Sequence, residues 1–339
     1  MPGPSPSTDW WAQRAPSAGA AVLATGTLSI GLDLAGYGVL SRIVLGLACA
    51  AWLILAADLT LRLLSAGTRW RAYTEVPGLV DTVATTALTT VAATAVLGTG
   101  FSAAGSQALA AALLVPAVLL WLVPLALPAQ DGERRRPGTV FARCTATQGL
   151  AVLGATLAAA ESAAWLARAA LVLFWLGLVL YVLALARFDV RQVAEGRGDH
   201  WLAAGALAIS ALAGARLISS DSAQLYLWNV DDRGVLRQVT VVLLVLTLAC
   251  CAVLLAAEFL RPRPRPRTDI RRWATVFAWA KTATAALAVA AALDVSWLDG
   301  AGEVLLWVAV AAWLGITAWA VASARAYVVP GRVRSRARR

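Results

Sequence analysis

The chain has 339 residues, of which 60% are hydrophobic and only 14% are Asp, Glu, Lys or Arg, and its mean hydropathy is +0.72. A soluble domain carries about 25% charged residues, so this composition argues against a water-soluble globule. The net charge of +10 first suggests a nucleic-acid partner, but the distribution of the charges explains it without one. The four cysteines (Cys49, Cys144, Cys250 and Cys251) form no C-x-x-C motif, so neither a disulfide framework nor a zinc site is predicted.

Ten apolar runs of about twenty residues, the length that spans a bilayer, follow one another along the chain. The polar, proline-rich residues 1–17 lack the short basic segment of a signal peptide, so the first run is predicted to be retained as a transmembrane helix. The predicted organisation is an N-terminal tail (1–17), a ten-helix transmembrane domain (18–327) and a basic tail (328–339). The runs lie near residues 18–36, 41–64, 80–98, 106–128, 143–160, 164–186, 201–218, 237–259, 272–293 and 302–325.

Arginine is distributed unevenly between the segments that connect these runs. Ten spans put both termini on one side, and a cytoplasmic placement gives 23 arginines in inside segments and five in outside segments. Cytoplasmic loops of membrane proteins carry such an excess of Lys and Arg. The sequence therefore predicts a multi-pass protein of the cell membrane with cytoplasmic termini. The Arg-Pro repeat at 261–267 is predicted to be a stiff cytoplasmic linker, and the Arg-rich tail is predicted to bind membrane lipid rather than nucleic acid.

The odd-numbered runs are interrupted by Thr, Ser, Gly and Gln, whereas the even-numbered runs are richer in Leu, Val and Trp. The odd runs start at intervals of 58 to 71 residues. This periodicity suggests five repeated helical hairpins, each with a polar first helix and an apolar second helix. We therefore predict an all-α integral membrane protein in which five hairpins form a ring around a central pore.

A stripe of threonines marks the third run. Thr82, Thr86, Thr90 and Thr94 recur every four residues, so they share one face of a helix. For any one of them helix packing is the better explanation, because a buried hydroxyl can bond the carbonyl one turn back. For the five polar helices taken together, a central water-filled path is the simpler explanation. The polar residues predicted to line this path are Thr25, Ser29, Thr86, Thr90, Gln148 and Ser210.

Three stretches resemble one family of membrane proteins. Residues 23–29 (LATGTLS) resemble the opening of the first helix in that family, residues 146–154 (ATQGLAVLG) the fifth helix, and residues 200–210 (HWLAAGALAIS) the seventh. The family is the tellurite-resistance/dicarboxylate transporter family, which includes the plant slow-type anion channels. The resemblance extends over nearly all ten spans. It implies a homotrimer of ten-helix protomers, each with its own pore lined by the five inner helices.

The resemblance also implies a phenylalanine gate on the ninth helix. Residues 273–277 (WATVF) are similar to the segment that carries it, so Phe277 is the matching position. Relatives often have proline after this phenylalanine, whereas Ala278 follows here, so the resemblance does not extend to a bend of the helix at the gate. Considered without the resemblance, Phe277 would be assigned to packing against lipid or another helix.

Lys281 is the only lysine, and it stands out without any resemblance. It lies about nine residues into the ninth run, roughly 13 Å deep at 1.5 Å per residue. An ionisable group at such a depth is costly and suggests a functional site. Because Lys281 follows Phe277 by one turn, both face the pore if either does. The alternative is an ion pair with Asp58 or Glu258, near the cytoplasmic ends of even runs.

These observations predict a protein that moves small anions, inorganic or carboxylate, through a pore lined by Thr and Ser and gated by Phe277. Hydroxyl dipoles bind anions weakly, which favours passage over retention. A proton-coupled carrier of monocarboxylates, dicarboxylates or tellurite is the main alternative, but the odd helices offer few intramembrane acids, and Asp33 and Asp294 lie near the outer ends. A scaffold without transport is a third possibility, which the threonine-lined helices argue against.

Enzymatic function has no support in the motifs of the chain. It contains no H-E-x-x-H, G-x-S-x-G or Walker sequence. His200, the single histidine, stands at the start of the seventh run, where an interfacial role is expected rather than catalysis. The fragment at 98–100 (GTG) lacks the strand that a dinucleotide site requires. We therefore predict neither catalysis nor a bound cofactor or metal.

Overall fold

The computed structural model describes residues 15–66, 79–126, 138–188, 201–221, 230–260 and 272–336. Within these residues the chain forms ten α-helices and one short 3₁₀ helix, and each α-helix coincides with one of the ten predicted runs. The helices are α2 (Ala15–Leu34), α3 (Gly38–Ala66), α5 (Leu79–Ala103), α6 (Gln107–Ala126), η1 (Gly138–Phe141), α7 (Ala142–Glu161), α8 (Ala164–Arg187), α10 (Trp201–Ser219), α11 (Val230–Leu260), α12 (Arg272–Leu293) and α13 (Ser296–Arg336).

Seven of the described helices are long and apolar enough to cross a membrane, namely α5, α6, α8, α10, α11, α12 and α13. Two more, α2 and α3, contain shorter apolar stretches at Gly19–Leu34 and Gly38–Ile54. The prediction of an all-helical, multi-pass membrane protein is therefore confirmed. The Arg-Pro repeat at 261–267 lies outside the described residues, as do the first fourteen residues of the predicted N-terminal tail.

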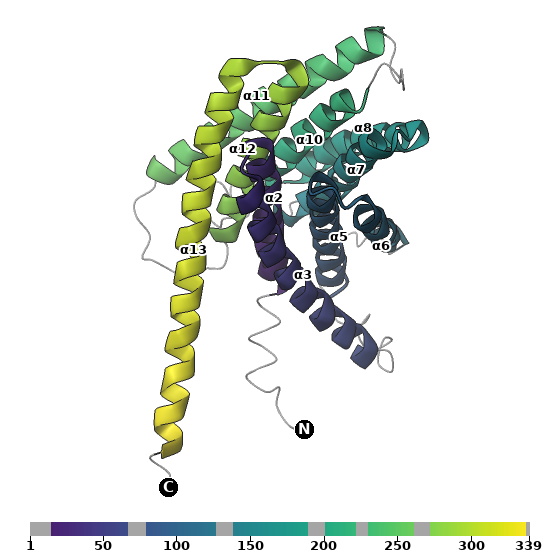
Figure 1. The fold of residues 1–339 in the computed structure, drawn as a ribbon. Helices are drawn as coiled ribbons and strands as arrows, with labels where there is room; N and C mark the ends of the chain where they lie inside the picture. Colours follow the sequence, from purple (N-terminus) through teal and green to yellow (C-terminus); the bar gives the residue numbers. More distant parts are fainter. Residues whose placement is uncertain are drawn as a thin grey trace.

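The helices divide into an inner set and an outer set (Figure 1). The apolar spans of α5, α10 and α12 are 78% buried, whereas those of α6, α8 and α13 are only 17–22% buried. In the inner set, α2 contacts α5, α5 contacts α7, α7 contacts α10, α10 contacts α12, and α12 contacts α2. Each outer helix, α3, α6, α8, α11 or α13, contacts the inner helix that precedes it in the chain. The difference in polarity between odd and even runs thus corresponds to a difference in burial.

Four of the connections from an inner to an outer helix are tight turns of one kind. One residue in each has a positive φ: Gly36 (84°), Gly105 (85°), Ser162 (51°) and Asp294 (56°). The next N–H donates to the carbonyl five residues earlier, as Tyr37 does to Leu32 at 2.8 Å. This is a Schellman cap, which satisfies carbonyls left free at the end of a helix. Glycine adopts a positive φ without steric cost, which explains Gly36 and Gly105.

Aromatic side chains gather beside these turns. Trp165 at the start of α8 and Trp297 at the start of α13 are 70% and 73% exposed. Tyr37, in the turn between α2 and α3, donates a hydrogen bond of 2.6 Å to Glu303 Oε1, and this bond raises the pKa of Tyr37. Exposed tryptophan and tyrosine are typical of the interface between membrane and water. Their positions indicate that the turns lie at one surface of the membrane.

Candidate functional site

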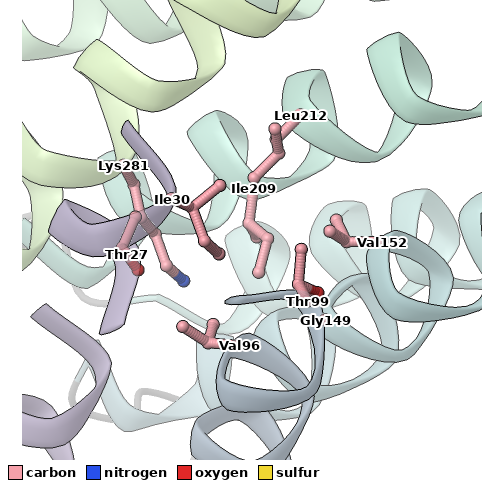
Figure 2. Close-up of a pocket in the computed structure, with 9 residues that line it drawn as sticks. All are labelled: Thr27, Ile30, Val96, Thr99, Gly149, Val152, Ile209, Leu212 and Lys281. Carbon is pink, nitrogen blue, oxygen red and sulfur yellow. The ribbon is translucent and has the colours of Figure 1, made fainter. Parts of the chain in front are cut away.

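A small cavity lies between the five inner helices, and every one of them contributes to its lining (Figure 2). The cavity is narrow, with room for about one water molecule. Its walls are apolar apart from two hydroxyls and one ammonium group. The lining residues are Thr27 and Ile30 of α2, Val96 and Thr99 of α5, Gly149 and Val152 of α7, Ile209 and Leu212 of α10, and Lys281 of α12.

Lys281 is the only ionisable residue among these lining residues. Its side chain is 1% exposed, and its Nζ points into the space between α2 and α5 in Figure 2. That nitrogen has no hydrogen-bond partner among the described residues. The alternative ion pair with Glu258 is not formed, because Glu258 is exposed near the end of α11 while Lys281 is buried. The side chain of Asp58, the other candidate partner, lies outside the described part of the structure.

Phe277 lies one turn before Lys281 on α12 and is also 1% exposed. The Nζ atom of Lys281 is 3.9 Å from the centroid of its ring. The ring belongs to a buried apolar cluster with residues of α2 and α5, among them Ala24 and Val96. It also packs against Gly205 of α10, where an added Cβ would lie 2.8 Å from Phe277 Cε1. Phe277 therefore lies between three inner helices, beside the cavity.

Comparison with known proteins identifies the family. The model of the SLAC1 family, described as voltage-dependent anion channels, matches residues 14–321, which include nine α-helices and η1 completely and most of α13. The chain belongs to this family. The family resemblance seen in the sequence is thereby confirmed. A search of curated proteins finds no match.

Two of the predicted polar residues lie on the face of α2 that meets outer helices of this SLAC1-family chain. Thr25 Oγ1 donates to Ala21 O at 2.8 Å and accepts from Trp313 Nε1 of α13 at 2.9 Å. Ser29 Oγ donates to Ser41 O of α3 at 2.9 Å, and Ser41 Oγ donates to Ser29 O at 2.8 Å. These bonds connect α2 to α13 and α3, and neither residue lines the cavity.

The threonine stripe of α5 makes similar bonds. Thr90 Oγ1 donates to Thr86 O at 2.9 Å, and Thr94 Oγ1 donates to Thr90 O at 2.8 Å. Thr94 also accepts a hydrogen bond of 3.1 Å from Trp52 Nε1 of α3. Neither Thr86 nor Thr90 is among the cavity residues. Thr82, the first residue of the stripe, has a side chain outside the described part.

The remaining two predicted polar residues also bond backbone carbonyls. Gln148 Nε2 donates to Phe174 O of α8 at 3.0 Å, while its buried Oε1 has no partner among the described residues. Ser210 Oγ donates to Ala206 O at 2.8 Å. Of the residues predicted from the sequence to line the path, only Lys281 lines this cavity. A role for the other six in an open pore stays a prediction.

The residues predicted from the sequence to line the path do not include Thr27 and Thr99, whose hydroxyl-bearing side chains line the cavity. Thr27 Oγ1 donates to Leu23 O at 2.7 Å, and Thr99 Oγ1 donates to Ala95 O at 2.9 Å. A regular spacing connects the lining residues, because α2, α5, α7 and α10 each contribute two residues three positions apart. Residues three apart share a helical face, so one such pair identifies the face of each helix that is turned to the cavity.

Proposed function

We propose that the protein conducts small anions, inorganic anions or small carboxylates, across the membrane along the axis of the five inner helices. Membership of the SLAC1 family makes anion transport the expected activity. The observation that carries the proposal is the ammonium of Lys281, which has no hydrogen-bond partner among the described residues, in a cavity to which all five inner helices contribute. A buried lysine that has no carboxylate partner within the described part of the chain favours occupation of the cavity by an anion, because an anion stabilises its charged form.

The architecture proposed for this activity is a ring of five hairpins around a pore, within the domain 18–327. The closed series of contacts among α2, α5, α7, α10 and α12 supports it, as does the contact of each inner helix with the next helix in the chain. The homotrimer implied by the resemblance is part of the proposal. The exposed apolar surfaces of the outer helices would then face lipid or a neighbouring protomer.

Phe277 is the proposed gate, and the structure corresponds to a closed pore in this proposal. A space for about one water molecule cannot pass a hydrated anion. The apolar walls at Ile30, Val96, Ile209 and Leu212 add the cost of removing water from the anion. Movement of the Phe277 ring away from α2, α5 and α10 would widen this constriction, and Lys281 would bind the entering anion.

Ion gradients across a bilayer that contains the purified protein test the proposal. In a chloride gradient without a pH gradient, the current is expected to reverse at the chloride Nernst potential, and an added pH gradient should not move it. Protein-free bilayers are the control. A reversal potential that follows pH would favour the proton-coupled carrier of carboxylates or tellurite. The absence of current and of anion uptake would contradict both.

The channel is favoured over the carrier because the described residues that line the cavity include no carboxylate. A proton-coupled carrier needs a titratable relay along its path. Asp33 and Asp294 lie near the ends of α2 and α12, at the turns into α3 and α13. Lys281 is the single ionisable residue of the cavity lining. A positive charge on this residue would attract anions into the cavity.

The proposed orientation puts both termini and residues 261–272 in the cytoplasm of the cell. Pro264→Cys should therefore resist a membrane-impermeant thiol reagent in intact cells and react after the cells are opened. Ala104→Cys, in the exposed turn between α5 and α6, is the matched control and should react from outside. Labelling of the cysteine at position 264 in intact cells would reverse the orientation.

A further inference from the structure

Phe277 could act as a gate and Lys281 could bind an anion without touching each other, but in the structure the two side chains are in direct contact. The Nζ atom lies 3.9 Å from the ring centroid, well within the distance of about 6 Å at which a cation is attracted by an aromatic ring. Both side chains are 1% exposed. Such a pair is stronger where water is excluded, so this contact stabilises the observed position of the ring.

The ring of Phe277 contacts this ammonium at a distance of 3.9 Å from the ring centroid. Within the part of the chain that the structure describes, Nζ has no hydrogen-bond partner, and the cavity around it has room for about one water molecule. The ring edge rests against Gly205 of α10. A bound anion of the size of chloride, added to the ring and the ammonium, would exceed this space. Ring contact and anion binding at Lys281 therefore exclude one another.

We propose that Lys281 and Phe277 form an anion-sensitive latch: the ammonium holds the ring in the closed position, and an anion opens the gate by replacing the ring as the partner of the ammonium. The inference rests on the proposed function and adds a trigger to it. An anion that binds only the open state raises the population of that state with its concentration. Lys281 acts on the gate as a positioning residue for Phe277.

The first test measures open probability as a function of chloride concentration, with gluconate as the replacement anion at constant ionic strength. The open probability of the parent protein should rise with chloride, and Lys281→Met should abolish this dependence. Thr282→Val is the matched control on the same turn, because the Thr282 hydroxyl bonds Ala278 O and approaches Cys251 of α11 instead of the cavity. An unchanged chloride dependence in Lys281→Met would overturn the latch.

The second test changes the ring electronically at nearly constant size. Phe277 is replaced by 4-cyanophenylalanine, whose ring attracts cations weakly, or by 4-methylphenylalanine as the matched control. The cyano variant should open at several-fold lower chloride than the methyl variant, up to about tenfold. The difference should vanish in the Lys281→Met background. If it persists there, ring shape and not the ammonium controls the gate.

Failure of the latch is distinguishable from failure of the proposed function. The reversal potential of every conducting variant reports anion selectivity and does not depend on how the gate opens. Anion currents that reverse at the chloride Nernst potential, combined with no effect of either test, would reject the latch and leave the function intact. Thermal unfolding of each purified variant in detergent confirms that it is folded before its current is compared.

Discussion

Phe277→Ala is expected to raise the basal anion current. The substitution removes a side chain that buries roughly 150 Å² or more, at the point where α2, α5 and α10 approach α12. The space it leaves would connect with the cavity beside Lys281. The measurement is the current through bilayers with equal amounts of parent and variant protein, at a fixed chloride gradient.

A second buried phenylalanine supplies the control for this experiment. Phe174 of α8 is also fully buried, but it belongs to a different apolar cluster. Both alanine variants should lose stability, by about 3 kcal/mol or more for a buried phenylalanine, and both should therefore unfold at lower temperature. Only Phe277→Ala should conduct more than the parent. A folded Phe277→Ala protein with the current of the parent would assign the gate to another residue.

Lys281→Glu is expected to abolish anion current almost completely. At about 4 Å and an effective dielectric constant near 20, the attraction between Lys281 and an anion is on the order of 4 kcal/mol before desolvation is subtracted. The substitution replaces this attraction by repulsion. Lys281→Met removes the charge and keeps the length, so it should weaken anion block and selectivity over cations. If about 1.4 kcal/mol of the attraction remains after desolvation is subtracted, the occupancy of the site by the anion changes tenfold when the charge is removed.

The controls for Lys281 are the carboxylates that the sequence offered as its partners. Glu258→Gln changes an exposed side chain near the end of α11 and should leave permeation almost unchanged. Asp58→Asn is expected to behave in the same way. If either variant reproduces Lys281→Met, or if Lys281→Glu conducts anions normally, Lys281 is a structural ion-pair partner and not a pore residue.

The helices and their division into inner and outer sets were accessible from the sequence because both depend on local composition. A run of about twenty apolar residues spans a membrane wherever it occurs, and all ten runs are helical in the structure. Helices interrupted by Thr, Ser and Gly are buried, since small residues allow close approach between helices. The depth of Lys281 alone identified it as unusual, and it lines the cavity.

The direction of each polar side chain was not accessible in the same way. Hydroxyls of Thr90 and Ser210 are satisfied by carbonyls of their own helices, so a polar residue on a buried helix needs no pore to accept its hydrogen bond. The rotation of a helix about its axis is set by its neighbours, which one sequence does not reveal. Ile209 and Leu212 line the cavity, yet by composition they are indistinguishable from core residues.

The four Schellman-capped turns are so short that they expose little peptide to which an antibody or a toxin could bind. In the proposed orientation these turns are all extracellular, and each leaves only a few residues between two helices, as at Gly36 and Asp294. An antibody or toxin therefore has little protruding peptide to hold at these four positions. The connection between α10 and α11, residues 220–229, is longer in sequence than any of these four turns. Reagents meant to block the channel from outside are best raised against that segment.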